Sequence, residues 1–293
     1  MKTAAVIGVG VMGSAIAGRL MDGGMRVALY DRKPEAGAAL AERGAIVAAS
    51  PAGAAEQADY VITSLNSAAI VEQAVFGDGG IRDVAGPDRL LVDMSSIDPT
   101  ATASMADRLH RETGMKWVDA PLSGGASAAR EGALTLMIGG APEDVARAGP
   151  LFDRLASNHT HMGACGAGQT VKLINQILCA GAFLTVAEAV HFAEQHGVDA
   201  ARIPAALAGG RADSRIMQEF MGKMARRDYS PTGRIDNMLK DLETVQAAAL
   251  ARHIAMPLTS LIADLHRMLV AGGLGSADSA AYMRLFDLAR EGE

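Results

Sequence analysis

The start of this sequence limits the possible folds most, because an apolar run of strand length leads directly into a glycine-rich turn. Residues 4–7 are typical of a buried strand, and the spacing GxGxxG follows before a helix-like segment. In such a unit one glycine permits a tight turn, one lets a ligand approach the backbone, and one lets helix and strand pack closely. The first helical amide groups would then face a dinucleotide pyrophosphate. The residues predicted to bind a dinucleotide here are Gly8, Gly10, Val11, Met12 and Gly13.

A second strand-like run, residues 26–30, ends in Asp31. Dinucleotide-binding units carry an acidic residue about 20 residues after the glycine-rich turn, where it accepts hydrogen bonds from the ribose hydroxyls. A carboxylate there repels a 2′-phosphate, which favours NAD over NADP. Arg32 follows directly and could meet such a phosphate, so NADP stays open as a cofactor. The alternative interpretation of Asp31 is a solvated residue at the end of a strand.

Apolar runs of strand length alternate with helix-length segments through the first half of the chain. Asp98-Pro99 and Pro142 are typical helix starts. This alternation predicts a doubly wound, mostly parallel sheet with helices on both faces. The predicted strands are residues 4–7, 26–30, 60–65, 90–93, 117–119 and 134–138.

The pattern changes after about Gly168. Residues 170–196 favour a helix that is apolar on nearly every side, so neighbours should enclose it. Further helices are predicted over residues 203–207, 214–225, 237–252, 258–271 and 279–290. A chain of 293 residues usually has more than one core. We therefore expect an α/β fold with a Rossmann-type domain over residues 1–163 and an all-helical substrate and oligomerisation domain over residues 164–293, joined by the long helix.

The composition argues against several classes of protein. Lys and Arg total 27 against 33 Asp and Glu, a formal net charge of -6 without a basic block, which speaks against nucleic-acid binding. The two cysteines make no disulfide framework and no metal motif, so we expect no metal and a reducing compartment. No signal peptide is apparent, and polar residues interrupt the apolar segment 174–190. These features predict a cytoplasmic protein without a membrane span.

Residues 119–125, with the sequence DAPLSGG, follow a predicted strand and are rich in small side chains. Successive backbone N–H groups at Ser123, Gly124 and Gly125 could bind a carboxylate without an arginine. A simple turn without a ligand explains the same residues equally well. The segment is therefore a candidate site for an anionic substrate, with both interpretations open.

Lys172 and Asn175 are three residues apart on the long predicted helix and share one of its faces. A lysine in the apolar part of an enclosed helix costs free energy unless it is paired or used. Burial lowers the pKa of a lysine, which suits proton exchange near neutral pH. From the residues alone, a lysine that reaches solvent from the first helical turns explains the position at least as well.

Five segments in this order resemble the β-hydroxyacid dehydrogenase family, which includes 3-hydroxyisobutyrate dehydrogenase and tartronate semialdehyde reductase. They are the GxGxMG start, Val92-Asp93-Met94-Ser95-Ser96, the DAPxSGG segment, the GxGxxxKxxNQ segment over residues 166–176, and Lys240-Asp241-Leu242. The resemblance covers essentially the whole chain. It implies an NAD(P)-dependent enzyme that interconverts a small 3-hydroxy acid with its aldehyde or ketone.

The resemblance also implies a role for particular residues. Lys172 would be the catalytic acid and base, and Asn175 would orient the substrate. The substrate carboxylate would bind at Ser123, Gly124 and Gly125, and the nicotinamide side of the cofactor would contact Leu65, Asn66, Ser96 and Lys240. A homodimer or homotetramer is expected, since the apolar helices of the second half are too many for one small domain to cover.

One departure from the family pattern bears on the substrate. Many members carry a phenylalanine near Pro231 that walls the substrate pocket, and Gly233 takes its place here. The missing ring suggests a bulkier or more polar substrate, as in a threonate- or serine-type dehydrogenase.

Two related enzyme families fit the sequence less well. A 6-phosphogluconate dehydrogenase is longer and usually has His-Asn after its lysine, and imine reductases typically lack the lysine. A non-catalytic dinucleotide-binding regulatory protein is the alternative from another functional class.

Overall fold

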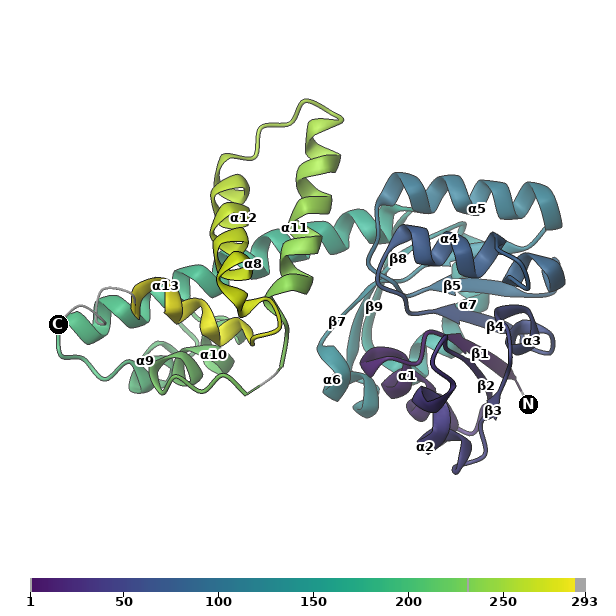
Figure 1. The fold of residues 1–293 in the computed structure, drawn as a ribbon, viewed down its shortest axis with the longest axis horizontal. Coiled ribbons are helices and arrows are strands. Elements are labelled where there is room, and N and C mark those ends of the chain that lie inside the picture. Colours follow the sequence, from purple (N-terminus) through teal and green to yellow (C-terminus); the bar gives the residue numbers. More distant parts are fainter. Residues whose placement is uncertain (1, 231, 288–293) are drawn as a thin grey trace. The chain divides into compact units, whose positions relative to one another are not determined.

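The computed structural model describes residues 2–230 and 232–287. The chain folds into two compact units, Met1–Lys172 and Leu173–Glu293 (Figure 1). Each unit has a core of its own, and each is described separately.

The first unit is a sheet with helices on both faces (Figure 1). Its strands are β1 (Thr3–Ile7), β2 (Arg26–Tyr30), β3 (Ile46–Val47), β4 (Tyr60–Thr63), β5 (Leu90–Asp93), β6 (Lys116–Asp119), β7 (Leu122–Ser123), β8 (Leu134–Gly139) and β9 (Ala156–Gly163). Its helices are α1 (Val11–Asp22), α2 (Ala38–Ala41), α3 (Pro51–Ala55), α4 (Ala68–Phe76), α5 (Pro99–Thr113), α6 (Gly125–Glu131) and α7 (Pro142–Leu155).

The strands are ordered β3-β2-β1-β4-β5-β6-β8-β7, and β9 pairs with β8. All pairs from β3 to β6 are parallel, β8 runs antiparallel to β6 and β7, and β9 is parallel to β8. The chain reverses its direction of winding at β1 and β4, and the carboxyl ends of these strands form the crevice where doubly wound sheets bind ligands. The predicted Rossmann-type, mostly parallel fold is confirmed.

Strand β1 shows why the predicted strands are apolar on both sides. Ala4 and Val6 belong to one buried cluster, with Ile16 of α1 and Phe152 of α7. Ala5 and Ile7 point the other way, into a second cluster with residues of α4 and α5. Because successive side chains of a strand face opposite sides of the sheet, both faces must be apolar when helices cover both.

The second unit is helical, and its core surrounds the long helix α8. Its helices are α8 (Ala167–Gln195, which begins in the first unit), α9 (Ile203–Leu207), α10 (Arg215–Ala225), α11 (Ile235–Leu250), α12 (Pro257–Leu269) and α13 (Arg284–Asp287). Phe183 of α8 meets the edge of Phe220 in this core. His266 is fully buried, donates from Nδ1 to the Ile262 carbonyl at 2.7 Å, and accepts from the Tyr282 hydroxyl at Nε2. Burial lowers the pKa of His266, which disfavours the charged form of its ring.

Helix α8 is, within residues 2–230 and 232–287, the one helix long and apolar enough to cross a membrane by length and composition. Core helices of globular proteins meet the same criterion. Its buried residues, among them Ala180, Ala187 and Val190, pack into the core of the second unit.

Several predicted elements differ from the structure. Strands β3, β7 and β9 were not predicted, and the strand expected over residues 60–65 ends at Thr63. The helix predicted over 258–271 ends at Leu269, and the following turn, Val270–Leu274, contains a kink at Gly273, which has a φ of 83°. The helix predicted over 279–290 begins as a 3-10 turn, Ser279–Met283, before α13; residues 288–290 lie outside the described residues.

Candidate active site

The glycine-rich turn after β1 is shaped by contacts that exclude side chains. A Cβ atom at Gly13 would lie 1.8 Å from the Gly8 carbonyl oxygen, and one at Gly8 would lie 2.4 Å from the Ser64 carbonyl oxygen. A Cβ at Gly10 would meet no protein atom within 4 Å. Two of the glycines are therefore explained by packing, whereas the space at Gly10 is left open on the side where a dinucleotide would approach.

Helix α1 begins directly after Gly10, which makes no side-chain cap. The N–H groups of the first helical turn, including those of Val11 and Met12, have no partner within an α-helix and carry the positive end of its dipole. No acidic residue lies in this turn, and Val11 is 74% exposed. An exposed apolar side chain beside free amides suits the pyrophosphate and adjoining apolar parts of a dinucleotide, so the residues present fit this group.

Asp31 lies at the end of β2, directly beside this turn. Its Oδ2 accepts a hydrogen bond from the Val9 amide at 2.8 Å, and its Oδ1 accepts one from the Lys33 amide at 2.9 Å. The carboxylate is half-buried, and Arg32 is exposed. The backbone thus holds the carboxylate in place next to the glycine turn, as a residue that contacts a ribose requires.

The loops after β4 and β5 are tied to each other. Ser95 Oγ accepts a hydrogen bond from the Leu65 amide at 3.0 Å. Asp93 Oδ1 accepts from Thr63 Oγ1 at 2.8 Å and from the Ser95 amide at 3.0 Å. Burial raises the pKa of Asp93 to about 6, against the opposing effect of these hydrogen bonds. The predicted cofactor residues Leu65, Asn66 and Ser96 lie on these two loops.

The predicted carboxylate site spans the end of β7 and the start of α6. Ser123 is half-buried and pairs with Thr135 of β8, whereas Gly124 and Gly125 are exposed. Both glycines have positive φ, 119° and 69°. A non-glycine residue is strained in that region, so two successive left-handed residues explain the glycine pair. They leave exposed backbone without a side-chain cap at the start of α6, and such backbone is suited to binding an anion.

Lys172 lies in the second turn of α8 and is 8% exposed. The start of its helix is anchored on the sheet by Asp119, the last residue of β6. Asp119 Oδ1 accepts from the Gly166 amide at 2.8 Å, and Oδ2 accepts from the Gln169 amide at 2.9 Å. A carboxylate that caps the first amides of a helix stabilises it by hydrogen bonding and by its charge. Burial raises the pKa of Asp119, and the two amides oppose this.

Cys165 precedes this helix and is half-buried. Burial and the neighbouring Asp119 carboxylate raise the pKa of its thiol above the ordinary value.

Asn175 and Lys240 lie in the second unit, on α8 and α11. Asn175 Nδ2 donates to Gln176 Oε1 at 2.9 Å, and Gln176 Nε2 donates to Asp241 Oδ2 at 2.6 Å. Lys240 Nζ lies 3.0 Å from the other oxygen of Asp241. The structure therefore joins these two predicted site residues through Gln176 and Asp241, which the sequence alone did not identify as a pair.

Asp119 and Gln169 make long-range hydrogen bonds in the first unit that the sequence did not predict. Both lie within the sequence motifs of the predicted site, Asp119 in DAPxSGG and Gln169 in GxGxxxKxxNQ. Their partners are 47 to 74 residues away in sequence. A polar residue with a small exposed fraction at a strand end or helix start is the signal that could have marked them.

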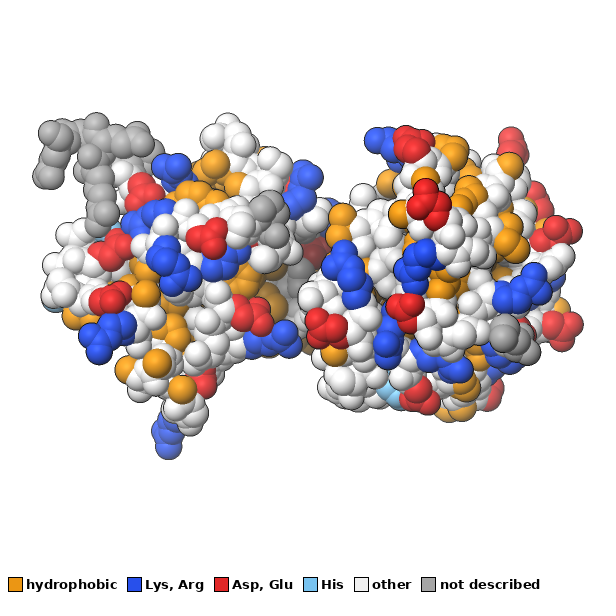
Figure 2. All heavy atoms as spheres, turned by 90° about the horizontal axis from the view of Figure 1, so that it is seen from below, with side chains coloured by type: hydrophobic (Ala, Val, Ile, Leu, Met, Phe, Trp, Pro, Cys, Tyr) orange, Lys and Arg blue, Asp and Glu red, His pale blue; other side chains and the backbone are white. Residues whose placement is uncertain are grey.

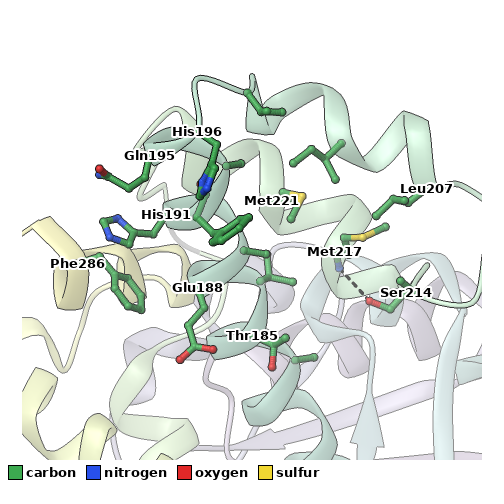
Figure 3. A pocket seen from close by; sticks show the side chains of 18 residues that line it. Thr185, Glu188, His191, Gln195, His196, Leu207, Ser214, Met217, Met221 and Phe286 are labelled. Atoms are coloured by element: carbon green, nitrogen blue, oxygen red, sulfur yellow. Dashed lines mark hydrogen bonds between the residues drawn. The ribbon is translucent and has the colours of Figure 1, made fainter.

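An apolar groove lies elsewhere, in the second unit. It has a volume of about 1080 Å³ and apolar walls from α8, α9, α10 and α13. Figure 3 shows His191 beside Phe286 on one side and Met217 and Met221 on the other. It begins about three helical turns beyond Lys172 along α8, so it does not include the predicted proton-transfer residue. No group of three His, Cys, Asp or Glu suited to a metal occurs in the described part of the chain.

Comparison with known proteins adds to this geometry. Residues 3–163 match a family model described as the NAD binding domain of 6-phosphogluconate dehydrogenase. Residues 166–286 match one described as the NAD-binding domain of NADP-dependent 3-hydroxyisobutyrate dehydrogenase.

The similar proteins share nearly their whole length with this chain. The 2-hydroxy-3-oxopropionate reductase of Escherichia coli is 34% identical over 96% of each chain. The NAD-dependent L-serine dehydrogenase of Pseudomonas aeruginosa is 35% identical over 98% of each chain. The solved structure of Mycobacterium tuberculosis 3-hydroxyisobutyrate dehydrogenase with L-serine has a TM-score of 0.88 at 29% identity, covering 98% of this chain and 99% of that one. Together with the glycine turn and the buried lysine, these matches show that the chain belongs to the β-hydroxyacid dehydrogenase family of NAD(P)-dependent oxidoreductases.

Proposed function

We propose that this protein is a dehydrogenase for a small 3-hydroxy acid, with Lys172 as its acid and base and NAD as its preferred cofactor. The observation that carries the proposal is a lysine with 8% exposure, on a helix anchored to the sheet of a dinucleotide-binding unit. In this proposal residues 1–163 bind the dinucleotide, and residues 164–293 provide the substrate and oligomerisation domain.

The proposal assigns these residues to three parts of the cofactor. Gly8, Gly10, Val11, Met12 and Gly13 hold the pyrophosphate, Asp31 and Arg32 face the adenosine ribose, and Leu65, Asn66, Ser96 and Lys240 line the nicotinamide side. Hydride transfer is the chemistry that the nicotinamide supplies when bound.

The substrate is held and deprotonated by this chain's own residues. Backbone N–H groups at Ser123, Gly124 and Gly125 bind the carboxylate, and Asn175 orients the 3-hydroxyl. In oxidation the neutral amine of Lys172 accepts the hydroxyl proton as the 3-carbon becomes a carbonyl. In reduction its ammonium form donates that proton to the carbonyl oxygen.

The substrate class can be tested with a panel of acids. The purified protein is incubated with 3-hydroxyisobutyrate, glycerate, serine and threonate, each with NAD or NADP, and the reduced cofactor is followed by absorbance. We expect turnover with at least one acid and a higher kcat/KM with NAD. Propionate, which lacks the 3-hydroxyl, is the control. NADH binding without oxidation of any acid would instead indicate a regulatory dinucleotide-binding protein.

A bulkier or more polar substrate is the second candidate, and Gly233 favours it. This residue is exposed, and a Cβ placed there would have only Ser279 Oγ near it, at 4.0 Å. The position therefore leaves space where family members carry a phenylalanine. In the panel, a preference for threonate or serine over 3-hydroxyisobutyrate would support this candidate.

The cofactor preference can be tested at Asp31 and Arg32 as a matched pair. Asp31→Ser removes the charge that repels a 2′-phosphate and the acceptor for the ribose hydroxyls. We expect the Kd of NADH to rise about tenfold and the Kd of NADPH to fall. Arg32→Ser should act in the opposite sense and raise the Kd of NADPH. Fluorescence titration measures both constants, and an unchanged NADPH-to-NADH ratio in Asp31→Ser would contradict the assignment.

We further propose a cytoplasmic homodimer or homotetramer that needs neither a membrane nor nucleic acid. Helix α8 carries Leu178 and Phe192 with 68% and 66% of their surface exposed, next to the apolar groove. A second subunit would remove such apolar surface from water. On the face drawn in Figure 2, basic and acidic side chains are interspersed, a distribution unlike that of a polyanion-binding surface.

A further inference from the structure

Gln169 is fully buried and lies one helical turn before Lys172 on α8. Its side-chain amide pairs with the loop that follows β5. Nε2 donates to the Ser95 carbonyl at 2.8 Å, and Oε1 accepts from the Ile97 amide at 3.2 Å. Its backbone amide donates to Asp119. One residue thus binds the ends of two neighbouring strands.

The loop that Gln169 pairs with is the one expected beside the nicotinamide. Residues 95–97 include Ser96, and Ser95 Oγ accepts from the Leu65 amide in the next loop. The contacts of Gln169 therefore connect the start of the lysine helix with the loops after β4 and β5. A buried amide costs free energy unless its polar atoms are hydrogen-bonded, and here both the oxygen and the nitrogen are.

Gln169 and Lys172 are three residues apart on one helix, so they lie on the same face. We propose that Gln169 is a positioning residue for the reaction: it holds the first turn of α8 against residues 95–97 and thereby sets the place of the Lys172 amine relative to the nicotinamide loops. Gln169 touches neither substrate nor cofactor in this role. The inference rests on the proposed function of Lys172.

Four titratable residues lie around Gln169 in the first unit. Asp93 lies at the end of β5, Asp119 at the end of β6, Cys165 before the helix, and Lys172 one turn beyond. None of these four is removed by a substitution at position 169. A methionine has nearly the length of glutamine but cannot make the two side-chain hydrogen bonds.

The first test compares Gln169→Met with Gln218→Met. Gln218 is the control, because it is a helical glutamine outside the proposed site; it is exposed, and its Nε2 donates to the Pro204 carbonyl at 3.0 Å and to Asp213 Oδ1 at 2.7 Å. We expect Gln169→Met to lower kcat about 10- to 100-fold, since small displacements of reacting groups have effects of this size. KM and the Kd of NADH should stay near those of the wild type. The control should keep its kcat.

Hydrogen exchange gives a readout independent of turnover. The Ile97 amide should lose protection in Gln169→Met, because its acceptor is removed, and should keep it in Gln218→Met. A wild-type kcat in Gln169→Met, or a parallel loss of NADH affinity and kcat, would overturn the proposal.

Gln169→Glu provides a second test, and it decides the matter if the methionine variant does not fold. A protonated glutamate can donate to the Ser95 carbonyl and accept from Ile97, whereas an ionised one places a charge against that carbonyl. The kcat of this variant divided by that of the wild type should rise as the pH falls, since burial favours the protonated form. The same ratio for a folded Gln169→Met should be flat. A flat ratio for Gln169→Glu would contradict the role of the amide.

Lys172→Ala distinguishes a failure of the proposed function from a failure of the positioning role of Gln169. If that variant keeps its turnover, the proposed function fails. If it is inactive while Gln169→Met behaves as the wild type, only the positioning role fails.

Discussion

Lys172→Ala is expected to lower kcat by about 10²- to 10⁴-fold, the usual contribution of a positioned acid or base. The reason is that the variant has no group at this place to accept the hydroxyl proton in oxidation or to donate it in reduction. The Kd of NADH should stay close to the wild-type value, because the pyrophosphate and ribose residues lie on β1, α1 and β2. Steady-state kinetics and fluorescence titration measure the two effects separately.

A further variant and its control test whether the reaction needs proton transfer at position 172 or merely a positive charge there. Lys172→Arg keeps the cation, but a guanidinium is not deprotonated in proteins, so we expect it to remain inactive in oxidation. Lys116→Ala is the control, since Lys116 is a half-buried lysine of the same unit with no role in the site. Partial recovery of Lys172→Ala by added methylamine would support proton transfer. Near-normal turnover of Lys172→Ala would exclude Lys172 as the acid and base.

Gly13→Ala and Gly10→Ala should differ sharply in stability. The new Cβ of Gly13→Ala would lie 1.8 Å from a backbone oxygen, so helix α1 must shift away from the turn. We expect the free energy of unfolding to fall by about 3 kcal/mol or more, and NADH binding to be lost. Thermal or denaturant unfolding of the protein without cofactor measures the first effect.

Gly10→Ala is the informative partner, because its Cβ meets no protein atom within 4 Å. The free energy of unfolding should change by less than about 1 kcal/mol, the range of an altered helix cap. The Kd of NADH should nevertheless rise at least about tenfold, since a methyl group would occupy space meant for the pyrophosphate. Wild-type affinity in Gly10→Ala would show that the dinucleotide does not approach the backbone at this position.

The parts of the fold predicted correctly were those with local signals. Buried parallel strands such as β1 and β5 are continuous apolar runs, and the cap Asp98-Pro99 marks the start of α5, with Asp98 Oδ1 accepting from the Ala101 amide at 2.8 Å. Strand β9 was missed for the opposite reason. Most of its residues are exposed and polar, so its pairing with β8 leaves no hydrophobic pattern in the sequence.

The candidate site shows the same division between local and distant signals. The glycine turn and the spacing of Lys172 and Asn175 are local, so the sequence predicts them. The capping of α8 by Asp119 depends on a strand end 47 residues before Gly166, and only the folded chain brings them together. The link of Lys240 to Asn175 through Gln176 and Asp241 likewise joins two helices that no spacing rule connects.

The raised pKa of the Cys165 thiol has a consequence for redox chemistry. Oxidants and alkylating reagents react with the thiolate form of cysteine, and a raised pKa keeps that form scarce at physiological pH. Although Cys165 directly precedes the residues that cap the lysine helix, we therefore expect its thiol to react slowly. Peroxide and thiol-modifying reagents should modify Cys165 slowly at neutral pH, and we expect no control of the enzyme through oxidation of this cysteine.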